Sequence, residues 1–227
     1  MAISTIEKAT HGPSAYELIK DIFNRFLAVL LLAILSPFIA IIMVIIRIDS
    51  PGNPIFSQEQ IGKDERKFML YKFRSMYVNN DNSKHMAYIR KYINENSSSW
   101  LDENGKDTYE LVNDPRITRF GALLRRSGLD ELLQLINVSK GDMAFIGPRP
   151  DVPFAVEMYK AHHRNRLLVK PGITGLWQVS GRRSLSFEDM VQLDIDYMNR
   201  QSPVLDTKIL LLTAREILFP DRVTVPE

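Results

Sequence analysis

At about 150 residues per domain, the 227 residues of the chain suit one compact domain with an appendage, and 45% hydrophobic with 25% charged residues excludes disorder of the whole chain. The formal net charge is only +2, so the overall charge does not indicate a nucleic-acid partner. There is no cysteine, which excludes disulfides, thiolate metal sites and a thiol nucleophile.

The first predicted element is an apolar helix over residues 26–46, a run without a charged residue that Arg25 and Arg47 flank. As a straight helix at about 1.5 Å per residue it would reach roughly 31 Å, enough to cross a bilayer core of about 30 Å. A cleaved signal peptide has a shorter apolar region. We therefore predict a membrane segment, with residues 1–25 as an N-terminal interfacial segment.

Ser36 and Pro37 stand at the centre of this run. Proline removes one amide donor and clashes with the carbonyl of Ala33, which predicts a kink. The Ser36 hydroxyl can bond back to the carbonyl of Leu32. Each half would then reach roughly 16 Å, about the middle of the bilayer, and a helix that turns there re-emerges on the side that it entered. The segment alone supports a re-entrant and a spanning helix about equally, although arginine at both ends agrees with two cytoplasmic ends.

The rest of the chain, residues 47–227, is predicted to form a cytosolic domain that begins with a β-hairpin. Turn residues at 62–64 separate two extended stretches, 55–58 and 68–74. In the second strand Lys72 and Arg74 share one face, which fits an ordinary amphipathic strand or a pair of substrate contacts. Residues 77–113 are predicted to be a surface insertion with one helix, over 84–93, and no chemistry.

A second group of candidate residues begins with Arg125 and Arg126, just before an acidic pair, Asp130 and Glu131. Ser127, three residues before Asp130, predicts a helix that begins at Ser127 with both acids in its first turn. Helix capping alone would explain the acids. The alternative is chemical, because a helix N-terminus stabilises an ionised carboxylate, the form that a nucleophile or a metal ligand requires. The two arginines would then bind phosphate.

The C-terminal part contains the strongest basic clustering. Two prolines flank Arg149, which marks either a rigid turn or a guanidinium presented to phosphate or base. Residues 159–186 hold six lysines and arginines, Arg182 among them, and no acid, so they could meet anionic lipid or a nucleotide diphosphate. A nucleic-acid partner is not expected, because a reading helix and an aromatic platform are missing. The last predicted helix, over 204–219, is amphipathic and not a second span.

Six motifs in order resemble the bacterial sugar transferases, and more narrowly the monotopic polyprenyl-phosphate phosphoglycosyl transferases. They are Ser36-Pro37 in the apolar helix, KFRSM at 72–76, DPRIT at 114–118, Asp130-Glu131, GPRP at 147–150 and KPGITG at 170–175. The resemblance covers about residues 17–219. Leu133, where the family usually has proline, and Gly128, where serine is common, depart from the pattern. Both departures lie at the predicted start of the helix that carries the acidic pair, and neither changes Asp130 or Glu131.

This resemblance implies transfer of a sugar 1-phosphate from a UDP-sugar to undecaprenyl phosphate, with release of UMP, at the start of surface glycan assembly. It implies that Asp130 attacks the sugar-linked phosphorus to form an aspartyl-phosphosugar intermediate, and that Glu131 assists as base or metal partner. Mg²⁺ at the two carboxylates would neutralise the diphosphate. The residues expected to bind substrate are Lys72, Arg74, Arg125, Arg126, Arg149 and Arg182. The family also favours the re-entrant form of the helix.

The predicted fold class is α+β, a membrane-embedded re-entrant helix over 26–46 followed by a mainly helical cytosolic domain with a small β-hairpin sheet. We expect it in the bacterial inner (cytoplasmic) membrane, in contact with membrane lipid and with the catalytic domain facing the cytoplasm. A homodimer is compatible with this arrangement. The rival hypothesis is a non-catalytic membrane adaptor whose basic loop binds anionic lipid or a protein partner, while Asp130 only caps a helix.

Overall fold

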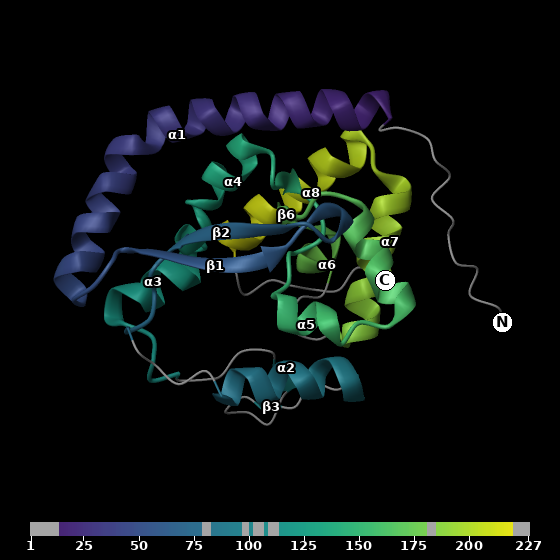
Figure 1. Ribbon diagram of the computed structural model, residues 1–227. Helices are drawn as coiled ribbons and strands as arrows, with labels where there is room; N and C mark the ends of the chain where they lie inside the picture. Colours follow the sequence, from purple (N-terminus) through teal and green to yellow (C-terminus); the bar gives the residue numbers. More distant parts are fainter. Residues whose placement is uncertain are drawn as a thin grey trace.

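A long N-terminal helix lies over a mainly helical body that contains short paired strands (Figure 1). The computed structural model describes residues 14–78, 83–96, 100–101, 107–108, 114–180 and 185–219. The α-helices are α1 (Ala15–Asp49), α2 (Ser83–Glu95), α3 (Arg119–Ser127), α4 (Gln134–Lys140), α5 (Pro153–Glu157), α6 (Leu176–Val179), α7 (Phe187–Arg200) and α8 (Pro203–Leu218). The 3₁₀ helices are η1 (Lys63–Glu65), η2 (Leu129–Glu131) and η3 (Ala161–Leu168).

The strands pair two by two, as β1 (Ile55–Ile61) with β2 (Lys67–Phe73), β3 (Trp100–Leu101) with β4 (Asp107–Thr108), and β5 (Ala144–Ile146) with β6 (Gly172–Thr174). The first two pairs are antiparallel and the third is parallel. The predicted mainly helical fold with a small hairpin sheet is confirmed. The parallel β5–β6 pair was not predicted.

Helix α1 is continuous but bent. It begins before the predicted apolar run, where the Ser14 side chain accepts a hydrogen bond from the backbone N–H of Glu17. In Figure 1 one arm follows the top of the body and the other turns down its side. Pro37 lies inside the helix, and proline is the usual cause of such a bend.

The serine before this proline satisfies a carbonyl that the proline leaves without a donor. In a regular helix the carbonyl of Ala33 would accept from the N–H of residue 37, which proline lacks. The Ser36 hydroxyl donates to this carbonyl at 2.9 Å, so the predicted bond to Leu32 is wrong by one residue. A serine hydroxyl in a helix can reach the carbonyl three or four residues before it. The hydroxyl of Ser36 bonds to Ala33, because that carbonyl is the one that proline leaves without a donor.

Both arms of α1 contribute to the core of the body. Ala28, before the proline, packs in a cluster with Leu70 and Val138. Ile42 and Ile46, after it, pack in a second cluster. The remaining surface is largely apolar and exposed, and includes Ile22, Phe26, Val29, Ile34, Phe38, Ile41 and Val44. By length and composition α1 could cross a membrane, and exposed apolar surface of this extent suits a lipid environment.

Polar contacts also tie the first arm of α1 to the body. The Lys20 ammonium donates to the carbonyl of Ile146 at 3.1 Å and lies 2.7 Å from the carboxylate of Asp206 in α8. The Tyr16 hydroxyl donates to the same carboxylate at 2.7 Å. These contacts are partly buried, so they fix the helix against strand β5 as well as against α8.

The β1–β2 hairpin is the element that brings Lys72 to the site. Its register runs from Ile55 opposite Phe73 to Ile61 opposite Lys67, which confirms the predicted hairpin. The side chain of Asn137 in α4 accepts from the N–H of Tyr71 at 3.1 Å and donates to the carbonyl of Met69 at 2.6 Å. An amide therefore occupies the outer edge of β2 and fixes the strand against α4.

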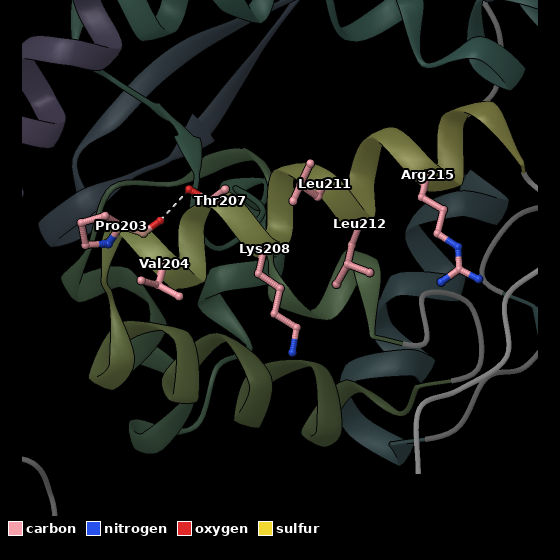
Figure 2. A pocket seen from close by; sticks show the side chains of 7 residues that line it. All are labelled: Pro203, Val204, Thr207, Lys208, Leu211, Leu212 and Arg215. Atoms are coloured by element: carbon pink, nitrogen blue, oxygen red, sulfur yellow. Dashed lines mark hydrogen bonds between the residues drawn. The ribbon is translucent and has the colours of Figure 1, made fainter.

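Two further predicted helices are observed, α2 over the predicted 84–93 and α8 over the predicted 204–219. Much of the predicted insertion, 77–113, lies outside the described residues. The predicted amphipathic character of α8 is wrong. Ile209 is fully buried, but Val204 and Leu211 are exposed, and the buried residues also include Asp206 and Glu216. Polar and apolar side chains therefore do not separate onto opposite faces of this helix. Figure 2 shows a groove along α8 with Lys208 and Arg215 extending to one side of the helix.

Candidate active site

The acidic pair lies in the short turn η2, between α3 and α4. Gly128 ends α3 with a φ of 69°, a left-handed conformation that glycine adopts without strain. Ser127 is the last residue of α3, and its hydroxyl donates back to the carbonyl of Leu123 at 2.9 Å. The prediction that a helix begins at Ser127 is therefore wrong. The glycine closes one helix, and α4 starts only at Gln134.

Glu131 is held by two cations from distant parts of the chain. The Lys72 ammonium and the Arg149 guanidinium each donate to Oε1 of Glu131 at 2.8 Å. Burial raises the pKa of Glu131, but the charges of Arg149 and Lys72 outweigh it and lower the pKa to about 2. Glu131 is thus ionised at neutral pH and links the hairpin to the loop 147–150.

Asp130 has a different environment from its neighbour. Within the described part of the chain, no group donates a hydrogen bond to its carboxylate or forms an ion pair with it. Burial raises the pKa of Asp130, with Lys72 opposing the shift and Glu131 adding to it. The expectation that a helix N-terminus stabilises the ionised form is wrong in direction, because η2 is a single turn and burial dominates. A partly buried carboxylate without a bonded partner is more basic and is free to meet a phosphorus or a cation.

The other predicted substrate-binding residues are dispersed. The positive charge of Arg125 acts on Asp130, whereas Arg126 lies on the exposed face of α3. Arg182 lies outside the described residues. Arg74 does not join Lys72, because β2 ends at Phe73 and the alternation of faces stops there.

The guanidinium of Arg74 is used instead at the end of α1. It is 6% exposed and donates to the carbonyls of Ser50 and Pro51 at 2.6 and 2.9 Å. The expected substrate contact is thus replaced by one that satisfies carbonyls beyond the helix C-terminus. Arg74 therefore fixes the second arm of α1 to the hairpin.

A buried charged cluster behind Arg149 was not predicted. Arg166 is 1% exposed, and its Nη2 donates to the main-chain carbonyl of Arg149 at 3.0 Å and lies 2.6 Å from Asp194. Its Nη1 donates to Asp151 at 2.8 Å and to the hydroxyl of Tyr159 at 2.7 Å. These four partners account for both terminal nitrogens of the guanidinium.

One sequence signal could have found this cluster. Asp194 follows Met190 by four residues and Val191 by three, so it stands on the apolar face of the amphipathic helix α7. An acid on a buried helix face needs a cationic partner. The basic stretch 159–186 offered several partners, and the pattern alone did not single out Arg166.

A second cluster, formed by His162, His163 and Glu188, brings possible ligand atoms within 4.8 Å of one another. The backbone N–H of Lys160 donates to Nδ1 of His163 at 3.1 Å. The proton of the neutral ring must then be on Nε2, which lies 3.0 Å from Glu188 and donates to it. A protonated Nε2 does not bind a metal. This cluster therefore packs η3 against α7 and is not a metal centre in this arrangement.

Known proteins match this chain over most of its length. The family described as bacterial sugar transferase matches residues 15–220. The chain is 38% identical over 214 residues to the galactosyl transferase CpsE of Streptococcus agalactiae, covering 92% of this chain and 45% of that protein. It is 37% identical over 204 residues to the undecaprenyl-phosphate galactose phosphotransferase of Salmonella typhimurium, covering 89% and 41%.

A shorter relative is matched along most of its length. The exopolysaccharide production protein ExoY of Sinorhizobium fredii is 34% identical over 194 residues, which cover 86% of this chain and 83% of that protein. The chain spans less than half the length of the CpsE and Salmonella relatives. The family match covers residues 15–220, which include the long apolar helix α1, the β1–β2 hairpin, η2 and the loop 147–150. The chain therefore belongs to the bacterial sugar transferase family.

Proposed function

We propose that the protein transfers a sugar 1-phosphate from a UDP-sugar to undecaprenyl phosphate, releases UMP and so starts the assembly of a surface glycan. The names of two relatives, a UDP-galactose-lipid carrier transferase and an undecaprenyl-phosphate galactose phosphotransferase, support this class of reaction. The observation that carries the proposal is the contrast within the acidic pair. Asp130 has no bonded partner among the described residues, whereas Glu131 beside it is held by two cations.

Asp130 is the proposed nucleophile. A carboxylate oxygen attacks the sugar-linked phosphorus of the donor, and the bond from this phosphorus to the bridging oxygen breaks, so UMP leaves with the electron pair. An oxygen of the lipid phosphate then attacks the same phosphorus. The carboxylate leaves, the lipid diphosphate sugar is formed, and Asp130 is regenerated. The raised pKa of Asp130 favours the first step, because a more basic carboxylate is a stronger nucleophile.

Glu131 has a positioning role in this scheme. It holds the ammonium of Lys72 and the guanidinium of Arg149 at 2.8 Å each, on the residue next to the nucleophile. Two fixed positive charges at this place stabilise the negative charge that the diphosphate develops as it breaks. Glu131 therefore arranges the cations in advance of substrate binding.

The acidic pair also fits Mg²⁺. This ion takes oxygen ligands and is usually bound by one or two carboxylates together with substrate phosphates. Both cations bind Oε1 of Glu131, so its Oε2, like the carboxylate of Asp130, has no hydrogen bond among the described residues. When bound there, Mg²⁺ supplies charge neutralisation of the diphosphate.

We also propose that α1 is re-entrant and that the body faces the cytoplasm of the bacterial cell. Ala28 and Ile46 lie on opposite sides of Pro37, yet both are buried against the same body. The two ends of a spanning helix are separated by a bilayer core of about 30 Å, so its two halves would not both pack on one cytosolic body. The bend in Figure 1 supports the same topology.

Topology is tested with single cysteines, which the chain permits because it has none of its own. Ser4→Cys and Glu227→Cys are treated with an impermeant thiol reagent in intact cells and in lysed cells. We expect labelling of both only after lysis. Labelling of Ser4→Cys from outside intact cells would establish a spanning helix. Pro37→Leu, which restores the missing helix bond, is expected to shift the segment toward that form.

Activity is tested with the purified protein, undecaprenyl phosphate, Mg²⁺ and a panel of UDP-sugars. We expect UMP release with at least one donor and none without Mg²⁺. The adaptor hypothesis expects no UMP with any donor, and binding to anionic vesicles that is unchanged in Asp130→Asn. The two hypotheses thus differ in the product formed and in the effect of one substitution.

A further inference from the structure

We propose that Arg166 is a positioning residue that holds the main chain of Arg149, so that the guanidinium of Arg149 is directed at Glu131 and at the diphosphate of the donor. This inference rests on the proposed function, in which Arg149 binds the donor. Arg166 is 1% exposed, so it lies beneath the loop and does not itself reach a substrate.

The loop that carries Arg149 is fixed by hydrogen bonds at this residue and on both sides of it. The carbonyl of Pro148 accepts from the N–H of Gly172 at 2.9 Å, and the carbonyl of Asp151 accepts from the N–H of Ile61 at 2.9 Å. These two bonds are between backbone groups. The carbonyl of Arg149, between them, accepts at 3.0 Å from the side chain of Arg166.

The guanidinium of Arg166 is itself immobilised. One terminal nitrogen bridges the Arg149 carbonyl and the carboxylate of Asp194, which is fully buried on α7. The other binds Asp151 and Tyr159 at 2.8 and 2.7 Å. A planar fork of fixed donors can serve all these partners together, and this geometry is particular to arginine. The cluster therefore links α7 to the backbone of the loop.

Arg166 could affect activity in two ways, by stabilising the fold or by positioning Arg149, and a single substitution of Arg166 does not distinguish them. If Arg166 only stabilises the fold, its replacement lowers the amount of active enzyme by the same factor whatever residue 149 is. If it acts through the guanidinium of Arg149, its replacement has an effect only while that guanidinium is present. A double-mutant cycle measures this difference directly.

The cycle uses Arg166→Lys, Arg149→Ala and the double variant, with kcat/KM for the UDP-sugar measured by UMP release. Lysine keeps a positive charge between Asp151 and Asp194 but lacks the fork that also reaches the carbonyl. We expect Arg166→Lys to lower kcat/KM about tenfold in the natural background, as for the loss of one hydrogen bond, and by less than about twofold in the Arg149→Ala background. Thermal unfolding of each variant gives its folded fraction.

The matched control is Arg164→Lys, the same change two residues away. Arg164 pairs with Glu65 at 2.7 Å on the surface. We expect this control to leave kcat/KM unchanged in both backgrounds. If Arg166→Lys does not fold, Tyr159→Phe takes its place, because it removes one contact of Nη1 and leaves the charge of Arg166 paired. A smaller loss that disappears in the Arg149→Ala background is then expected.

Equal factors in the two backgrounds would overturn the inference and leave the proposed function standing. An Arg149→Ala protein with unaltered kcat/KM would contradict the donor contact of Arg149 itself, and with it this inference. If no UDP-sugar gave UMP release with the natural protein, the proposed function itself would be contradicted. The three failures are therefore distinguished by which arm of the experiment departs from expectation.

Discussion

Two of the clusters in which arginine meets carboxylates, one around Glu131 and one around Arg166, differ chiefly in exposure. Arg149 and Glu131 have side chains that are 39% and 19% exposed, and the next residue, Asp130, has no bonded partner in the described chain. Arg166 and Asp194 are 1% and 0% exposed, and both terminal nitrogens of the arginine are bound. The same ion-pair chemistry thus serves an open site, where an unused carboxylate can meet a ligand, and a sealed one, where unsatisfied atoms such as Arg166 Nε and Asp194 Oδ1 are buried away from any ligand. The unused carboxylate, and not the number of charges, marks the reactive region.

The substitution with the largest expected effect is Asp130→Asn, which tests whether the carboxylate without a bonded partner is the reactive one. Asparagine has a similar size, so the fold should remain, but an amide is not a nucleophile. We expect turnover to fall by about three orders of magnitude or more, as for removal of a covalent nucleophile. A donor radiolabelled in the sugar should label the natural protein, and not the variant, when acceptor is withheld.

The control for this experiment is Asp196→Asn, the same change on α7, where the carboxylate accepts an exposed hydrogen bond from Gln192 at 2.9 Å. It should retain full turnover. Substantial activity of Asp130→Asn, in a preparation shown by mass spectrometry to be free of deamidation, would remove Asp130 from the nucleophile role.

In the sealed cluster the largest expected effect is on stability. Asp194→Ala leaves the fully buried guanidinium of Arg166 without one of its two carboxylates. Breaking a buried ion pair from one side costs about 3–5 kcal/mol in the free energy of unfolding. Burial raises the pKa of Asp194 to about 7, so denaturant titration in detergent is carried out above that pH, where the carboxylate is ionised. A change below about 1 kcal/mol would show that Asp151 alone compensates the charge.

The open cluster is expected to impose a pH dependence on stability. The pKa of Glu131 is about 2 in the folded protein against an ordinary value of 4.5. Ionised Glu131 therefore stabilises the fold above pH 4.5, and this contribution, about 3 kcal/mol, is lost as the pH falls from about 5 to 2. Glu131→Gln should lack this part of the acid dependence. Parallel curves for variant and natural protein would contradict the ion pairs with Lys72 and Arg149.

The smallest expected effect comes from a pair that belongs to neither cluster. Arg164 and Glu65 lie 2.7 Å apart, but their side chains are 39% and 50% exposed. Water screens such a pair, so Glu65→Gln should change the free energy of unfolding by less than roughly 1 kcal/mol. Turnover should be unchanged. A larger loss of stability would mean that exposed and buried ion pairs in this protein do not differ in strength as their exposure predicts.

Local patterns were sufficient to predict several elements. The turn residues at 62–64 predicted the β1–β2 hairpin, the pattern over 204–219 predicted a helix that corresponds to α8, and Pro37 predicted the bend of α1. Each of these depends on residues close together in sequence. The β5–β6 pair escaped prediction because its strands have only three residues each, too few for a recognisable alternation.

The site could be predicted only in part, because its contacts depend on the tertiary fold. The resemblance to the family singled out Asp130, Glu131 and Arg149, but Lys72 and Glu131 are 59 residues apart and no local pattern joins them. Arg74 satisfies carbonyls beyond the end of α1, a need that exists only once that helix packs on the hairpin. Ser127 was misassigned because the same hydroxyl can cap a following helix or bond back to the preceding one.

The way α1 is built into the body bears on how this protein can be prepared. A fragment that starts after Asp49 would lose Ala28, Ile42 and Ile46 from two core clusters. It would also lack Lys20, which forms an ion pair with Asp206. The helix is therefore not a detachable anchor, and truncation is no route to a soluble catalytic fragment. Engineering for solubility has to spare the inward face of the helix and replace only outward residues such as Ile22, Phe26 and Ile41.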